Sequence, residues 1–390
     1  MNLMEICELI VDCPHSTAKD EKYGYPLVRT PNIGKGRLLL DNVYRVSEEV
    51  YNERNKRAIP QKNDLILARE APVGNVAIIK EGQNVCLGQR TVLIRPNKEK
   101  VNPDYLVYYL LSPGVQYRFL NASNGATVSH LNMSDIRNLE IEVPDISIQN
   151  KIGKFLSLID DKISDNYKIN KNLEQQAETL FHSLFVENVN LTWKDGVLSD
   201  LGTVVAGGTP SKTKPEYYSE QGIAWITPKD LSLNKSKFIS HGEIDISELG
   251  FSKSSATKMP TGTVLFSSRA PIGYIAIAVN EVTTNQGFKS VVPNENIGTA
   301  FMYYLLKFLL PTIEGMASGS TFKEISGAGM KSVPVVIPDN ETIEKFNTFC
   351  TPIFQQQEVL ETENSRLTDI RDALLPKLMS GEIDVSNINL

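Results

Sequence analysis

The sequence repeats itself: its second half echoes its first half in the same order, at an offset that drifts from about 199 to about 191 residues. The clearest pair is Ala71-Pro72-Val73-Gly74 and Ala270-Pro271-Ile272-Gly273. The other matched pairs are Thr30-Pro31 with Thr227-Pro228, Gln89 with Gln286, Tyr108-Tyr109 with Tyr303-Tyr304, Gly125-Ala126-Thr127 with Gly319-Ser320-Thr321, Val143-Pro144 with Ile337-Pro338, and Phe155 with Phe346. A repeat this long indicates a duplicated domain, because solenoid units are far shorter.

Each copy has the pattern of a mixed globule followed by a long helix. The apolar runs Leu65–Ala68 and Val76–Ile79 flank a Pro/Gly turn and predict two strands, and Val264–Phe266 and Ile275–Ala278 repeat them. A helix follows in which Asn102 is the expected cap, Pro103 and Asp104 suit the first turn, and Tyr105–Leu111 are apolar. We therefore expect an α+β fold with two pseudo-symmetric globular domains, at residues 1–145 and 191–338, separated by long helical spacers at 146–190 and 339–390.

The two spacers are almost free of Gly and Pro, and their apolar residues recur in steps of three and four. This is the pattern of a heptad seam, so two antiparallel helices forming a coiled coil are expected. The predicted pairing residues are Leu156, Ile159, Ile163, Leu173 and Leu180 in the first helix, and Phe346, Ile353, Leu360, Leu367 and Leu374 in the second. Buried amides fix the register of helix pairs, and each seam carries them near its middle (Asn166, Asn170, Gln357 and Asn364). The alternative is a pair of amphipathic helices that pack on separate globules.

The net charge of −6 is unevenly distributed along the chain. Residues 1–145 hold 18 basic and 18 acidic side chains and residues 191–338 hold 13 and 12, whereas residues 339–390 hold 4 and 10. The neutral globules are compatible with a basic DNA-binding face, and the acidic last segment is typical of a solvated or protein-binding helix.

Four scattered cysteines (Cys7, Cys13, Cys86 and Cys350) predict a reduced, cytoplasmic protein rather than a disulfide scaffold. The sequence contains no run of about 18 apolar residues and no basic segment followed by an apolar one. We therefore expect neither a membrane-spanning helix nor a signal peptide.

The order globule, long helix, globule, long helix resembles the specificity subunit of Type I restriction–modification enzymes. The stretch Arg371–Ile383 is similar to the typical ending of that family, and Gln176–Phe185 resembles the end of its central helix. Cys13–Thr17, Gly207–Ser211 and the two Ala-Pro turns also resemble family patterns. The resemblance extends over essentially the whole chain, and the order and duplication of these short motifs make it specific.

The resemblance implies that each globule is a target recognition domain that reads one half of a split, asymmetric DNA site. The helices would hold the globules apart and dock two modification (methyltransferase) subunits, which bind S-adenosylmethionine and transfer the methyl group. Restriction (motor–nuclease) subunits would complete the complex on double-stranded DNA. The chain itself would be non-catalytic and would hold no cofactor.

Catalytic and metal motifs are weak by comparison. Asn102-Pro103-Asp104-Tyr105 resembles the Asn-Pro-Pro-Tyr element of amino-methyltransferases, but its third residue differs and no glycine-rich loop precedes it. Cys7, Cys13 and His15 lack the spacing and the fourth ligand of a zinc site. No nucleophile, base and acid stand in a catalytic arrangement. Two alternatives to the recognition subunit remain: an S-adenosylmethionine-dependent methyltransferase with fused recognition domains, and a coiled-coil scaffold that does not bind DNA.

The candidates for DNA contact are polar residues in loops, because Arg and Lys read guanine, Gln and Asn read adenine, and Ser and Thr serve bases or phosphates. In the first globule they are His15, Ser16, Thr17, Arg29, Asn32, Lys35, Arg69, Gln89, Arg90, Asn124 and Thr127. In the second they are Thr209, Ser211, Lys229, Ser268, Arg269, Asn285, Gln286, Ser318, Ser320, Thr321 and Lys323. Arg90 and Arg269 are the preferred base readers, since they adjoin repeated features without being repeated themselves. For any single residue, a turn-forming or solvated role is the alternative.

Overall fold

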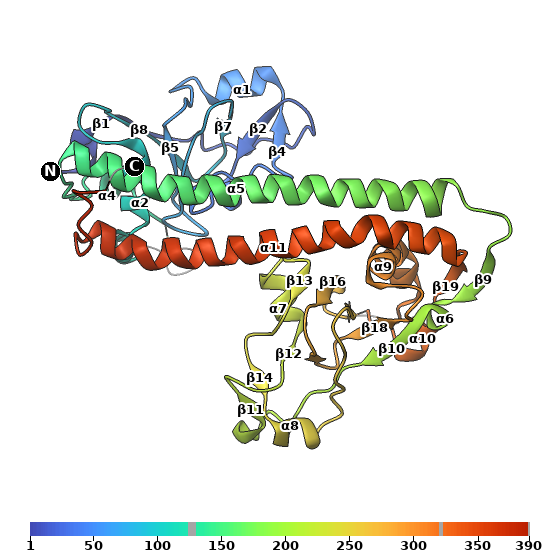
Figure 1. Cartoon of the computed structure of the whole chain (residues 1–390). Coiled ribbons are helices and arrows are strands. Elements are labelled where there is room, and N and C mark those ends of the chain that lie inside the picture. Colours follow the sequence, from blue (N-terminus) through green and yellow to red (C-terminus); the bar gives the residue numbers. More distant parts are fainter. Residues whose placement is uncertain (124–129, 320–322, 389–390) are drawn as a thin grey trace. The chain divides into compact units, whose positions relative to one another are not determined.

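The computed structural model describes residues 1–123, 130–319 and 323–388. It divides into two compact units, which are treated separately below. Unit 1 comprises residues 1–165 and 364–390, and unit 2 comprises residues 166–363. Both boundaries pass through the long helices α5 (Ile146–His182) and α11 (Asn340–Met379), so each unit contains one globule and a segment of both helices (Figure 1).

The globule of unit 1 combines strands with short helices. Its strands are β1 (Cys7–Asp12), β2 (Tyr25–Val28), β3 (Gly36–Arg37), β4 (Tyr44–Val46), β5 (Leu65–Ala68), β6 (Val76–Ile78), β7 (Cys86–Leu87) and β8 (Thr91–Pro96). Its helices are η1 (Leu3–Ile6), η2 (Thr30–Asn32), α1 (Glu48–Arg54), α2 (Pro103–Leu111), α3 (Pro113–Ala122) and α4 (Met133–Arg137).

The globule of unit 2 has the same kind of composition. Its strands are β9 (Lys194–Val197), β10 (Gly202–Ala206), β11 (Tyr218–Ser219), β12 (Trp225–Ile226), β13 (Phe238–Ile239), β14 (Asp245–Ile246), β15 (Val264–Ser268), β16 (Ile272–Ala278), β17 (Thr283–Thr284), β18 (Lys289–Pro293) and β19 (Pro334–Ile337). Its helices are η3 (Ser183–Glu187), α6 (Leu198–Leu201), η4 (Pro215–Tyr217), α7 (Pro228–Leu233), α8 (Glu248–Ser252), α9 (Thr299–Met316) and α10 (Gly327–Lys331).

The main sheets of the two units have the same topology. Their strand orders are β1-β8-β5-β6-β3 and β10-β18-β15-β16-β13. In each sheet only the last pair is parallel, β3 with β6 and β13 with β16. The fold is thus mixed and duplicated. The strands expected from the Leu65 and Val76 runs and from their repeats are confirmed, and so is the Asn102 cap, whose side chain accepts the Tyr105 N–H at 2.9 Å.

Both faces of each central strand are buried, and the alternation of side chains along the strand decides which core each residue joins. In β5, Leu65 and Leu67 pack with α2 in one core, whereas Ile66 packs in a second core beneath the sheet. In β15, Phe266 and Leu265 divide in the same way between two cores. A sheet that is covered on both sides provides a rigid support for the loops at its ends.

Segments of α5 and α11 run in opposite directions within each unit. In unit 2, Asn166 donates to Glu363 at 2.7 Å, and Gln357 donates to the main-chain oxygen of Asn170 at 3.3 Å. A later residue of α5 therefore contacts an earlier residue of α11, as antiparallel helices require. In unit 1, Arg371 donates to Asp160 at 2.7 Å.

The predicted pairing residues lie on the covered side of these helices. Leu156, Ile159, Ile163, Phe346, Ile353 and Leu360 are buried, and Leu173, Leu180, Leu367 and Leu374 are half-buried. Several of them also belong to the globular cores, since Leu156 packs with the first globule and Phe346 with the second. Each helix therefore begins on its own globule, and the end of the other helix joins the same core. Two residues that the predicted seam did not include are also buried, Leu375 in the core of unit 1 and Phe181 in the core of unit 2.

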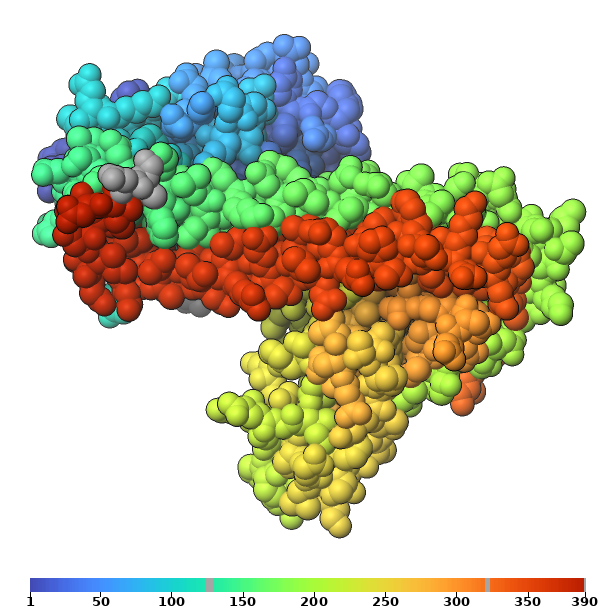
Figure 2. Space-filling model, in the orientation of Figure 1, coloured from blue at the N-terminus to red at the C-terminus, as the bar shows by residue number. Residues whose placement is uncertain are grey.

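The last described residues of the chain return to the first globule. Val385 joins the core of unit 1, and Lys151 of α5 donates to the main-chain oxygen of Ser386 at 2.5 Å. Figure 2 shows this red segment lying against the green surface of α5. Within the described residues, no helix has the length and apolar character needed to cross a membrane.

Candidate nucleic-acid interface

The repeated Ala-Pro turns have the same backbone form in both globules. The Ala71–Pro72 and Ala270–Pro271 peptide bonds are both cis, and both alanines have positive φ. Each turn follows the central strand of its sheet, β5 or β15. The residues just before the turns are Glu70 and Arg269, so equivalent backbone positions carry opposite charges.

In unit 2 this turn borders an open cavity of about 600 Å³. Five of the residues predicted to contact DNA line it: Thr209, Lys229, Arg269, Asn285 and Gln286. These residues come from four separate stretches of the sequence, and the fold brings them together. The wall of the cavity also includes the aromatic rings of Tyr218 and Trp225, which pack edge to face with their centroids 5.8 Å apart.

Two of the cations that line this cavity pair with carboxylates. Lys229 lies 2.5 Å from Glu243, and both side chains are largely exposed. Arg269 lies 3.3 Å from Glu324, which also attracts Lys289 at 3.7 Å. Burial lowers the pKa of Lys289 from its ordinary value, against the attraction of Glu324. Arg269 contacts Glu324 through Nη1 and also lines the cavity, where its guanidinium is a candidate hydrogen-bond donor.

The corresponding surface of unit 1 carries a different set of groups. Arg90 has positive φ, is exposed, and pairs through Nε with Glu70 at 2.9 Å. Gln89 donates to the main-chain oxygen of His15 at 2.7 Å, and the His15 ring lies 3.2 Å from Asp12. An ion pair at the surface contributes little to stability, about 0–1 kcal/mol, so the exposed Arg90 can exchange its half-buried partner Glu70 for another one at small cost to the fold.

Four predicted contact residues are instead used inside the fold. Arg69 is held by two 2.9 Å bonds to Asp12 and by a 2.7 Å bond to the main chain of Leu131. Asn32 is buried and donates to the main chain of Leu39, and Ser268 is buried and donates to the main chain of Gly287. Arg29 stacks over the Tyr44 ring at 3.5 Å. Their bonded groups hold neighbouring segments of the fold together.

The remaining predicted residues fall into two groups. His15, Ser16, Thr17, Lys35, Ser211, Ser318 and Lys323 are exposed. Asn124, Thr127, Ser320 and Thr321 lie outside the described residues. In the part of the chain that the structure describes, no three His, Cys, Asp or Glu side chains gather as metal ligands would. The four cysteines are buried, and burial raises the pKa of the Cys7 thiol to about 12.

The aromatic residues of the cavity wall and the residue that caps α7 beside the cavity were not predicted from the sequence. Trp225 stands two residues before the repeated Thr227-Pro228, and its indole donates to the main chain of Gly208 at 3.0 Å. Asp230 accepts the Thr227 N–H at 2.7 Å and the Thr227 hydroxyl at 2.6 Å, which caps α7 beside the cavity. The repeat of Thr-Pro could have pointed to this stretch, because it marks an equivalent loop in both globules.

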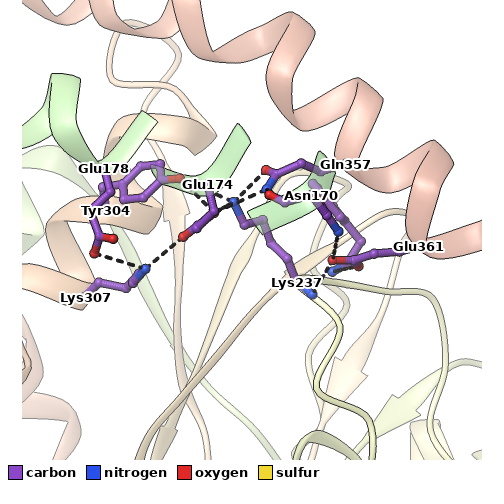
Figure 3. Close-up of polar contacts among 9 residues, drawn as sticks. Asn170, Glu174, Glu178, Lys237, Tyr304, Lys307, Gln357 and Glu361 are labelled. Carbon is purple, nitrogen blue, oxygen red and sulfur yellow. Dashed lines mark hydrogen bonds and ion pairs between the residues drawn. The ribbon is translucent and has the colours of Figure 1, made fainter. Parts of the chain in front are cut away.

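A buried polar cluster joins the globule of unit 2 to its helix segments (Figure 3). Lys237 forms a short ion pair with Glu174 of α5 and donates to Gln357 of α11 at 2.7 Å. Tyr304 and Lys307 of α9 donate to the same Glu174 carboxylate at 2.9 and 2.8 Å. Burial acts to raise the pKa of Glu174, but Lys237 and Lys307 overcome it and hold that pKa at about 2.

Comparison with known proteins matches the whole of this architecture. Residues 1–175 and 190–368 match the family model described as the Type I restriction modification DNA specificity domain. A 173-residue stretch is 38% identical to the MjaIX specificity subunit of Methanocaldococcus jannaschii, and covers 44% of this chain and 40% of that protein. The HindI specificity subunit of Haemophilus influenzae is 24% identical, with 84% of this chain and 88% of that protein covered.

Among solved structures, the crystal structure of the Type-I restriction-modification system S subunit from M. genitalium has the same fold. Its TM-score against this chain is 0.62 at 18% identity, and the superposition covers 97% of this chain and 95% of that one. At this identity the likeness concerns the fold, and the residues that line the cavity must be judged from their own chemistry.

Proposed function

This chain belongs to the family of Type I restriction–modification DNA specificity subunits, and from that premise we propose that each globule reads one half of a bipartite, asymmetric DNA site. The chain performs no catalysis itself in this proposal. It directs the methyl transfer of two modification subunits, which hold the S-adenosylmethionine, to the DNA site that it reads. It directs the restriction subunits by the same recognition.

The observation that carries this proposal is a constant backbone frame with different side chains. The Arg69 N–H donates to the main chain of Arg90 at 2.9 Å, and the equivalent Ser268 N–H donates to Gly287 at 2.7 Å. The Leu131 N–H donates to Arg69 at 3.1 Å, and Ile325 donates to Ser268 at 3.1 Å.

On this frame the side chains differ at each equivalent position. Unit 1 presents Glu70, Arg90 and His130. Unit 2 presents Arg269, Gly287 and Glu324 in their places. Since guanidinium and carboxylate groups select different base edges, the same scaffold would read two different half-sites.

In unit 2 the cavity supplies the reading surface. Arg269 is suited to guanine and Gln286 to adenine, and Thr209, which bonds to Gln286, orients the amide. Lys229 is suited to a phosphate, which would replace Glu243 as its partner. These groups belong to loops held by a rigid sheet, as recognition residues usually do.

The helices supply spacing and docking in this proposal. We propose that α5 and α11 form an antiparallel coiled coil along the predicted seam, and a 37-residue helix is about 56 Å long at about 1.5 Å per residue. Exposed apolar side chains lie on both helices, Leu158 and Ile370 in unit 1 and Ile169 and Val359 in unit 2. They would bind the apolar helices of the modification subunits.

The test is methylation of a randomised site library by the chain reconstituted with its modification subunit. Arg269→Ala should relax the preference in one half-site only, at a cost of about 1–3 kcal/mol if the guanidinium contacts a base. Arg90→Ala should do the same in the other half-site. The control is Lys331→Ala, because Lys331 is exposed and does not line the cavity. Equal degradation of both halves by Arg269→Ala would contradict separate reading.

Two further measurements separate the alternatives. Binding of S-adenosylmethionine to the isolated chain would favour a fused methyltransferase over a recognition subunit. A salt titration of DNA binding by the complex distinguishes a recognition subunit from a scaffold that does not bind DNA. When a protein neutralises phosphates, its affinity for DNA falls steeply with salt.

A further inference from the structure

We propose that Lys237 is a positioning residue, which fixes the reading cavity of unit 2 on the helix segments and thereby sets the length of the unread gap in the DNA site. This inference rests on the proposed function. It assigns a role to a buried cation that does not line the cavity of the candidate readers.

The Lys237 side chain is buried among groups from both helix segments. Its side chain is 6% exposed, and it contacts Glu174 of α5 and Gln357 of α11 at once. Its ammonium also lies 4.3 Å from the ring centroid of Phe354 and 4.7 Å from that of Tyr303. The ammonium also donates to the Tyr304 hydroxyl at 3.4 Å, and a buried cation with three polar partners and aromatic faces around it has one preferred position, because a displacement weakens the compensation of its charge.

The main chain at this point is fixed to the helix as well. The N–H groups of Lys237 and Phe238 donate to the Glu361 carboxylate of α11 at 3.2 and 3.3 Å. On its other side, the carbonyl of Lys237 accepts the Ile277 N–H of β16 at 2.7 Å. One residue therefore bonds to both helix segments and to the central sheet (Figure 3).

A short, continuous stretch connects this anchor to the cavity. The cavity wall includes Trp225, Thr227, Lys229 and Asp230, and α7 (Pro228–Leu233) leads from them to Lys237. Asp230 caps the start of α7 and also accepts the Glu243 N–H at 2.9 Å. The stretch from residue 225 to residue 239 is thus bonded at both ends, and a shift at Lys237 would displace the cavity.

The first globule has a different residue at the equivalent position of its strand. The pairing of Arg37 with Ile78 and of Phe238 with Ile277 makes Gly36 the counterpart of Lys237. A Cβ atom at Gly36 would lie 2.7 Å from the Asp160 carboxylate, so only glycine allows this close approach. Asp160 is instead bonded by Tyr108 at 2.6 Å and by Arg371 at 2.7 Å. Lys237 is therefore specific to the second globule.

The experiment uses the full chain in complex with its modification subunit and a DNA library with fixed half-sites and a variable gap. Wild type should methylate one gap length strongly. Lys237→Met should lower the ratio of methylation at that gap to methylation at gaps one base pair shorter or longer by roughly ten- to a hundredfold, since a misplacement near 1 Å has effects of this size. The base preferences within each half-site should stay as they are.

The matched control is Lys307→Met. Lys307 binds the same Glu174 carboxylate at 2.8 Å, but it lies on α9, outside the stretch from residue 225 to residue 239 that leads to the cavity. Its gap ratio should equal that of wild type. A residue that only stabilises the fold would reduce methylation at all gaps alike and leave the ratio unchanged.

Two further variants test the inference even if Lys237→Met does not fold. Lys237→Arg should restore most of the gap preference, and Glu174→Gln should weaken it less than Lys237→Met does. An unchanged gap ratio in folded Lys237→Met or in Glu174→Gln, or an equal loss in Lys307→Met, would overturn the inference. If wild type itself shows no preference for a bipartite site, the proposed function fails instead.

Discussion

Acid should destabilise unit 2 through Glu174, and the magnitude follows from its surroundings. In the unfolded chain this carboxyl has the ordinary pKa of 4.5, whereas in the fold Lys237 and Lys307 hold its pKa at about 2. The unfolded state therefore takes up a proton first, and stability falls as the pH drops from about 4.5 to about 2. The difference corresponds to about 3 kcal/mol that is fully present above pH 4.5.

Tryptophan fluorescence can report on this unit selectively. The sequence has two tryptophans, Trp193 and Trp225, and both belong to unit 2. Urea unfolding followed by this fluorescence at neutral pH and at several values between 4.5 and 2 gives stability against pH for wild type and for Glu174→Gln. The variant should be less stable at neutral pH, and the two curves should converge as the pH falls.

The control is Glu178→Gln. Glu178 is half-buried and lies 3.5 Å from Lys307, and its side chain is more exposed than that of Glu174, so its loss should cost no more than about 1 kcal/mol. Curves for wild type and Glu174→Gln that run parallel across the acid range would refute the reasoning, because they would show that Glu174 binds its proton equally in both states.

Other perturbations address the remaining interactions. Arg371→Ala should destabilise the protein by about 3–5 kcal/mol, because it leaves the Asp160 carboxylate buried without its cation; circular dichroism during urea unfolding measures this, and a change below about 1 kcal/mol would argue against it. Asn102→Ala should cost about 1 kcal/mol through loss of the α2 cap, seen as faster amide exchange at Tyr105. Leu360→Asp should cost several kcal/mol, and a wild-type melting temperature would defeat the seam. Insertion of one heptad into α5 should widen the gap of the DNA site by about three base pairs, since it adds roughly 10 Å; methylome sequencing would reveal an unchanged gap if the helix does not set the spacing.

Local features of the fold could be predicted from the sequence. The strand at Leu65 follows from a continuous apolar run beside a Pro/Gly turn, and the cap at Asn102 follows from the chemistry of the residues next to it. The duplication extended the strand predictions to the second globule, and the equal strand orders confirm that it was a duplication of whole domains.

The candidate site was predicted less completely, because long-range contacts decide which polar residues are available. Arg69 has the same sequence signals as Arg90, yet Asp12, at a distance of 57 residues in the chain, holds its guanidinium inside the fold. Lys237 is one of 40 basic residues in the sequence, and its partners Glu174 and Gln357 lie 63 and 120 residues away. Nothing local distinguishes such a residue from a solvated lysine.

The anchor of the second globule is divided between parts of the chain, and this affects any chimaera built from it. Lys237 belongs to the globule, whereas Glu174 and Gln357 belong to the helices. Lys307, the second cation on Glu174, also belongs to the globule, so a donor globule with apolar residues at both positions would leave the Glu174 carboxylate buried without a cation. A graft that exchanges residues 191–338 alone therefore carries a mismatch into the core, whereas a graft that also exchanges positions 174 and 357 keeps the donor's own pairing.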